Sequence, residues 1–298
     1  MFPLSNMQKF EHSSIGTKLF LQINSSDDFS EKFSEIIAFL DAFDDKYSRF
    51  KKDNWLYTLN QSGQNLLDEH TEKMIFFMQK IARETDGYFD PTIGKRLSEL
   101  GYGNSDFFFS PKKFSHQDLE KILTISENIV FIKKWFELEF GGLGKWYLID
   151  WIFDFLQKNL PENVDFLINF GGDMACRGTW KIALESPFVD GEAIGILEFS
   201  NSFLACSAGN KRKFWKSHHL INPYSGESAR EIAAVFLETP NMIQNAGMLT
   251  DSLATAFSVM DWDFATQKIN NFHKIQGVLV RKSGEFFKTP NSHMHLFS

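Results

Sequence analysis

The order of helix-like and strand-like patterns constrains the fold of this chain more than any other feature of its sequence. Segments 29–47 and 69–85 carry apolar residues at helical spacing, and Asp68 or Thr71 is a suitable cap for the second helix. Strand-like segments are more numerous. We predict strands over 18–23, 128–133, 135–140, 164–170, 180–185, 193–199, 233–238 and, as the last strand of the sheet, 278–280, with further helices over 145–156, 250–261 and 263–272.

This irregular order favours an α+β fold over a doubly wound parallel sheet, in which strands and helices would alternate regularly. A length of 298 residues is compatible with one large domain or two ordinary ones. Residues 104–117 contain a Phe run and Pro111 but lack the composition of a linker, so we interpret them as an excursion within one domain. We therefore expect a single large domain over 1–298, with mixed, largely antiparallel sheets flanked by helices.

Charge and composition exclude several classes of protein. The chain has 31 basic and 38 acidic residues, a net charge of −7, which argues against a nucleic-acid partner that needs a basic surface. A hydrophobic content of 43% excludes a disordered tail protein. No window approaches the roughly 20 consecutive apolar residues of a membrane-spanning helix, because Asp150 and Asp154 interrupt one of the most apolar stretches. We expect a soluble protein with no membrane span.

The first 20 residues lack the charged, apolar and small-residue regions of a secretory signal, so we expect a cytoplasmic protein. The alternative is an exported or membrane-anchored protein whose signal has been removed. Cys176 and Cys206 are far apart and form no C-x-x-C pair, which excludes a disulfide framework and a cysteine zinc site. We expect both to be reduced, buried thiols.

Asp251 and Thr255 stand four residues apart in the predicted late helix, so their side chains project from the same face. Two hard oxygen donors side by side suit Mg²⁺, which also accepts water and substrate phosphates as ligands. The structural alternative is an Asp that stabilises the helix dipole and a Thr that bonds back to a carbonyl. Taken alone, the pair favours this structural explanation.

A glycine-rich corner lies between a predicted strand and the helix over 145–156. Gly141, Gly142 and Gly144 precede Lys145, so backbone amides, a helix N-terminus and an ammonium group are available there for an anion such as a diphosphate. A tight structural turn is the commoner explanation of such spacing. The run from Gly171 to Asp173 has the same two interpretations.

His218 and His219 precede a turn that contains Asn222 and Pro223. Adjacent side chains diverge on a strand, so at most one of these imidazoles faces a given site. That histidine is a candidate general base near neutral pH. A surface or core histidine is the default alternative.

Taken together in chain order, these segments resemble the ApbE family of flavin transferases, the FAD:protein FMN transferases. The resemblance covers most of the chain. The matching motifs lie at 15–17, 47–50 through 59–60, 87–94 with 100–103, 139–150, 169–173, 207–209, 219–226 and 250–256.

The resemblance implies an ApbE-like α+β enzyme that binds FAD with Mg²⁺ and cleaves the pyrophosphate. FMN would be joined through a phosphodiester to a Thr or Ser of a target flavoprotein, with release of AMP. His219 matches the family's proposed base, and Lys145 would assist the departure of AMP. The implied metal ligands are Asp251, Thr255 and the carbonyl of Gly142, and the implied FAD contacts are Ile15, Phe50, Tyr88, Phe89, Asp90, Glu139, Lys145 and Ile221.

Several positions depart from the family pattern. Trp146 replaces a Gly and could narrow or reshape the site, whereas Phe50 replaces a Tyr and leaves open whether a protein hydroxyl or water attacks. The alternatives are therefore a Mg²⁺-dependent FAD pyrophosphatase that gives FMN and AMP, or a non-catalytic flavin-binding protein. Retention of the implied metal-binding and catalytic side chains argues against the latter: Asp251, Thr255, Lys145 and His219. The other departures are Glu139 for Asp, Asn222 for Asp, Ala208 for Ser and Ile15 for Met.

Overall fold

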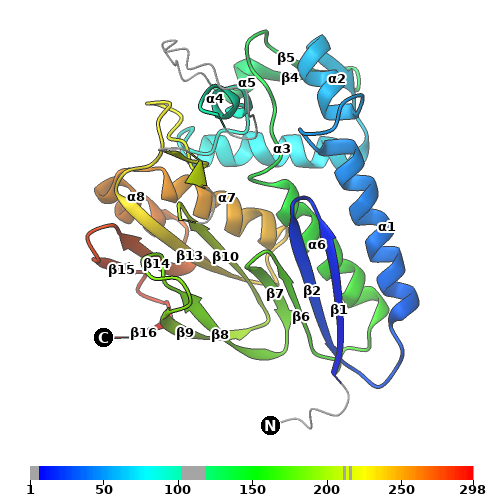
Figure 1. Cartoon of the computed structure of the whole chain (residues 1–298), viewed down its shortest axis with the longest axis vertical. Coiled ribbons are helices and arrows are strands. Elements are labelled where there is room, and N and C mark those ends of the chain that lie inside the picture. Colours follow the sequence, from blue (N-terminus) through cyan, green and yellow to red (C-terminus); the bar gives the residue numbers. More distant parts are fainter. Residues whose placement is uncertain (1–6, 102–117, 211–212, 215–216, 298) are drawn as a thin grey trace.

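A central eight-stranded sheet organises the computed structural model, which describes residues 7–101, 118–210, 213–214 and 217–297 (Figure 1). Every neighbouring pair of strands in this sheet is antiparallel. The strands lie in the order β1 (Met7–Ser14), β2 (Thr17–Asn24), β6 (Phe166–Phe170), β7 (Asp173–Arg177), β10 (Ser202–Ala208), β13 (Ile232–Pro240), β14 (Gln276–Arg281) and β15 (Phe286–Lys288).

Three small antiparallel sheets accompany the central one. Two have three strands, β16 (His295–Leu296), β9 (Ala193–Ser200) and β8 (Thr179–Glu185) in one, and β3 (Gln64–Leu66), β5 (Ile129–Ile132) and β4 (Leu123–Ser126) in the other. The third is the hairpin of β11 (Lys213–Phe214) and β12 (Ser217–His218).

Helices cover one face of the central sheet, where α6 contacts β6 and β7 and α7 contacts β10 and β13 (Figure 1). Within the described residues, no helix combines the length and apolar character needed to cross a bilayer. The helices are α1 (Ser30–Tyr47), α2 (Trp55–Ser62), α3 (Glu69–Glu84), α4 (Gly94–Glu99), α5 (Leu119–Ile122), α6 (Gly144–Asn159), α7 (Ala246–Ser258), α8 (Trp262–Lys268) and the 3-10 turn η2 (Ile269–Asn271).

The alternation of side chains along β10 shows how the layers are held together. Phe203 and Ala205 belong to the large core between the sheet and the helices. Leu204 belongs to a second core, which also includes Leu197 and Phe199 of β9 and therefore joins the central sheet to the β8–β9 sheet. The central sheet is buried on both faces across these strands.

The expected α+β fold with largely antiparallel sheets and flanking helices is confirmed. Asp68 is the cap of α3, because its carboxylate accepts the backbone N–H of Thr71 at 2.8 Å. The segment 104–117, which we interpreted as an excursion, lies entirely outside the described residues, which resume at 118.

Three expectations about strands are wrong. Residues 135–140 form a loop with one bridge from Glu137 to Ile93, and β5 pairs instead with β3 and β4. Some backbone groups of this loop form hydrogen bonds with side chains instead of with a neighbouring strand. For example, the N–H of Leu138 donates to the side chain of Asn60 at 2.8 Å. The chain opens with the β1–β2 hairpin rather than with a single strand, and β15 extends the sheet beyond 278–280.

Neither Cys176 nor Cys206 forms a disulfide, so both are thiols. Cys176 is buried as expected, but Cys206 is half-buried because it faces the cavity described below. The expectation of two buried thiols is therefore wrong for Cys206.

Candidate active site

A cavity of about 690 Å³ collects most of the predicted site residues from distant parts of the chain. This volume lies in the usual range for small-molecule sites, roughly 300–1,000 Å³. Its wall includes the turn after β1, the loop after α3, the glycine-rich corner, the ends of β7, β8 and β10, the segment after β12 and one face of α7. The predicted residues that line it are Tyr88, Phe89, Asp90, Glu139, Gly142, Lys145, His219, Ile221, Asp251 and Thr255.

Two predicted FAD contacts, Ile15 and Phe50, are not among the residues that line this wall. Ile15 occupies the β1–β2 turn with a φ of 47° and packs against the large core, whereas the next two residues, Gly16 and Thr17, line the cavity. The side chain of Phe50 is 67% exposed, and the guanidinium of Arg49 lies 5.7 Å from the centre of its ring.

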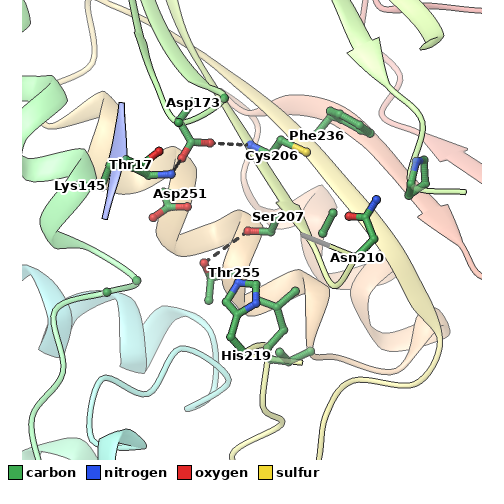
Figure 2. A pocket seen from close by; sticks show the side chains of 18 of the residues that line it. Thr17, Lys145, Asp173, Cys206, Ser207, Asn210, His219, Phe236, Asp251 and Thr255 are labelled. Atoms are coloured by element: carbon green, nitrogen blue, oxygen red, sulfur yellow. Dashed lines mark hydrogen bonds and ion pairs between the residues drawn. The ribbon is translucent and has the colours of Figure 1, made fainter. Parts of the chain in front are cut away.

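Lys145 is the second residue of α6 and reaches the cavity from the start of that helix. The first residue of the helix, Gly144, donates its backbone N–H to the carbonyl of Phe140, and a Cβ at Gly144 would lie 3.2 Å from the ring of Phe43. The ammonium of Lys145 forms an ion pair with Asp173 (Figure 2). A cation is thus fixed beside a helix N-terminus, where backbone dipoles also favour anions.

The glycine-rich corner is shaped by Glu139, whose carboxylate accepts the backbone N–H of Gly141 at 2.7 Å. A Cβ at Gly141 would collide with an oxygen of this carboxylate, so a larger residue there would require the side chain of Glu139 to move. Arg49 lies 3.5 Å from the second oxygen of Glu139. Glu139 therefore contributes both to the cavity wall and to the local turn.

Asp251 and Thr255 line the cavity one turn apart on α7, and their side chains project on the same side of the helix (Figure 2). Asp251 is 7% exposed, and the hydroxyl of Thr255 lies 3.5 Å from that of Ser207 on β10. The described residues contain no group of three or more His, Cys, Asp and Glu side chains able to hold a metal. A metal at this place would therefore need hydroxyl or carbonyl oxygens besides the carboxylate, and such oxygens suit Mg²⁺.

His218 and His219 point to different surroundings, as expected of neighbours in extended backbone. The ring Nε2 of His218 lies 3.0 Å from the carbonyl of Ala229, and the ring packs against Gly209. His219 lines the cavity and lies near Thr255 (Figure 2). An imidazole, a carboxylate, a hydroxyl and an ammonium therefore share one cavity.

Asn222 preserves the turn that follows His219. Its side-chain oxygen accepts the backbone N–H groups of Tyr224 and Ser225 at 2.8 and 3.1 Å, as an aspartate would. Its side-chain NH₂ donates to the carbonyl of Val259 at 2.8 Å, which an ionised aspartate could not do. The amide thus fits this position.

Trp146 is fully buried and packs beside Phe203 rather than in the cavity wall. A Cβ at Gly247 would lie 2.8 Å from its ring, so the indole occupies the space between α6 and α7. Trp146 therefore packs between the two helices that carry site residues, and it does not itself narrow the cavity.

The sequence did not indicate the contribution of the segment 182–187, which also lines the cavity. Its alternating pattern predicted the strand β8, but a strand beside a cavity has the same pattern as one beside solvent. Asp173 and Ser207 lie in the matching motifs 169–173 and 207–209, but the sequence assigns no role to either side chain. Thr17 and Asn210 line the cavity as well.

Comparisons with known proteins place the chain in a family and identify proteins of the same fold. The family model described as the ApbE family matches residues 15–279. A FAD:protein FMN transferase of Klebsiella pneumoniae (strain 342) is 35% identical over 95 residues, which are 30% of this chain and 29% of that protein. The FAD:protein FMN transferase of Vibrio cholerae serotype O1 is 21% identical over 281 residues, which are 86% of this chain and 80% of that protein.

Among solved structures, the ApbE protein of Thermotoga maritima superimposes with a TM-score of 0.84 at 22% identity, covering 95% of this chain and 97% of that one. The flavin transferase ApbE of Vibrio cholerae has a TM-score of 0.80 at 20% identity, with coverage of 95% and 97%. At these identities the structural matches establish the fold.

Proposed function

Because this chain belongs to the ApbE family, we propose that it is a FAD:protein FMN transferase that requires Mg²⁺. A Thr or Ser hydroxyl of a target flavoprotein would attack the flavin-side phosphorus of FAD. The new P–O bond would attach FMN to the protein, the pyrophosphate P–O bond would break, and AMP would leave. The observation that carries this proposal is the meeting of Lys145, His219, Asp251 and Thr255 in one cavity.

The oxygen donors present fit the proposed metal. Asp251, Thr255 and the carbonyl of Gly142 would hold Mg²⁺, since all three residues line the cavity and offer hard oxygens. Bound there, Mg²⁺ supplies positive charge that neutralises pyrophosphate oxygens.

Lys145 and His219 provide the remaining chemistry. The ammonium of Lys145 would bind the phosphates and stabilise the negative charge that develops on departing AMP. His219 would accept the proton of the attacking hydroxyl. The aromatic rings of Tyr88 and Phe89, which also line the cavity, would contact the flavin or the adenine.

The proposal is tested by incubating the protein with FAD, MgCl₂ and an apo-flavoprotein domain that carries an FMN-accepting Thr, followed by mass spectrometry of protein and nucleotides. We expect AMP and an FMN adduct in equal amounts. The Asp251→Asn variant should lower the rate about 100-fold or more, because it loses the charged metal ligand. Asp154→Asn, on the exposed side of α6, is the matched control and should leave the rate unchanged.

Two other outcomes would contradict transfer. Formation of FMN and AMP without any protein adduct, on this acceptor and on further flavoprotein acceptors, would identify a FAD pyrophosphatase. Binding of FAD with no consumption in the presence of Mg²⁺ would identify a flavin-binding protein.

A further inference from the structure

Asp173 is a buried carboxylate in the cavity wall that the proposed reaction does not use. It is the first residue of β7 and follows Gly171 and Gly172, whose φ values of 66° and 94° turn the chain back into the sheet. A Cβ at Gly171 would collide with Thr17, so this tight turn beside β2 requires glycine. The backbone therefore sets the position of Asp173 closely.

The two oxygens of Asp173 have different partners. Oδ1 accepts the backbone N–H of Cys206 on β10 at 3.0 Å, and Oδ2 forms the ion pair with the ammonium of Lys145 (Figure 2). The side chains are 3% exposed for Asp173 and 16% exposed for Lys145. One oxygen is thus anchored to the sheet, and the other is paired with the cation at the start of α6.

Lysine alone is a flexible partner for a phosphate, because its side chain has four rotatable bonds and loses rotamer entropy when it is fixed. A contact with a rigid carboxylate removes much of this freedom before the substrate arrives. Preorganisation of this kind acts on the transition state, where the position of the charge matters most.

We propose that Asp173 is a positioning residue that aims the ammonium of Lys145 at the pyrophosphate of the bound dinucleotide. The inference rests on the proposed function, since it explains how Lys145 is oriented for that reaction. Asp173 itself carries a negative charge next to the phosphate site, so its contribution to binding FAD is unfavourable or neutral.

The test is a double-mutant cycle with Asp173→Asn and Lys145→Met in the full-length protein. Asn keeps an oxygen for the N–H of Cys206 but loses the charge that holds Lys145. We expect Asp173→Asn to lower kcat by about 10- to 100-fold while the Kd of FAD, measured by equilibrium dialysis, stays the same or falls. In the Lys145→Met background the same substitution should have almost no effect on kcat.

If Asp173 had only a structural role, the substitution Asp173→Asn would give a different result. It would lower kcat by the same factor in both backgrounds, raise the Kd of FAD and lower the melting temperature, and this outcome would overturn the inference. Asp173→Ala, which also loses the bond to Cys206, reports the structural part separately. If the wild-type protein does not consume FAD, the proposed function fails and the inference with it, whereas a wild type that turns over while the effects are additive overturns the inference alone.

Discussion

At the scale of single residues, the adjacent histidines His218 and His219 have different roles: the first is structural, and the second is a candidate base. His218 contacts the carbonyl of Ala229 and packs on Gly209, whereas His219 lines the cavity. The sequence predicted that the two side chains diverge. It did not indicate which of them faces the cavity from the residues alone, because both have the same chemistry and adjacent positions.

We predict that His219→Asn lowers kcat for transfer by about 100- to 10,000-fold, because the variant loses a general base. The Kd of FAD should change little, since the proposed role concerns the acceptor hydroxyl. Rapid-quench assays at saturating FAD measure kcat, and dialysis measures binding. His218→Asn is the comparison: it should lower the melting temperature more than His219→Asn does. Full activity in His219→Asn would remove this residue from the mechanism.

At the scale of elements, Asp150 joins the two helices that carry the charged site residues. It lies on α6, and its carboxylate accepts the backbone N–H groups of Gly247 and Met248, both at 2.9 Å, at the start of α7. Asn245 precedes that helix in a left-handed conformation and makes no side-chain cap. A residue from a helix about 100 positions earlier therefore caps α7 and sets its place relative to α6.

Burial raises the pKa of Asp150 to about 7. The hydrogen bonds from the backbone N–H groups of Met248 and Gly247 partly offset this rise. Asp154 raises the pKa and Lys73 lowers it by smaller amounts. A folded-state pKa above the unfolded value means that folding takes up a proton between about pH 4 and 7. The contribution of Asp150 to stability is therefore largest below its unfolded pKa and is lost as the pH rises toward its folded pKa.

The free energy of unfolding from urea titrations at pH 5, 6, 7 and 8 checks this prediction. Ionisation of Asp150 should contribute a fall of up to about 1.4 kcal/mol per pH unit between pH 5 and 7, and little further change above its folded pKa. Asp150→Asn cannot ionise, so its curve should be flatter than that of the wild type. Asp190→Asn, at an exposed loop position, should keep the wild-type slope. Equal slopes for Asp150→Asn and wild type would contradict the assignment.

At the scale of the whole molecule, the cavity lies where the central sheet, the helical layer and the β8–β9 sheet meet. Its wall runs from Gly16 near the start of the chain to Val259 after α7. A ligand that touches all these segments should stabilise them together, because binding to the folded state alone shifts the folding equilibrium.

We predict that FAD with Mg²⁺ raises the melting temperature more than FMN or AMP with Mg²⁺ does, since each product fills only part of the cavity. At a concentration 100 times its Kd, a ligand adds about 2.7 kcal/mol to the free energy of unfolding. Thermal melts followed by circular dichroism avoid interference from flavin fluorescence. Asp251→Asn should lose the part of the shift that depends on Mg²⁺. An equal shift with AMP alone would contradict binding of the whole dinucleotide.

The fold class, most helices and strands, and most of the segments that form the cavity could be predicted from the sequence alone, because hydrophobic period, glycine corners and ordered motifs are local signals. It did not determine the partners of β5, the place of Phe50 outside the cavity wall, or the burial of Trp146 between helices. Tertiary structure also decided that Asp173 meets Lys145 and that Asp150 caps α7. Such contacts join residues far apart in the chain, and no local pattern records which distant backbone groups and charges will satisfy one another once the layers pack.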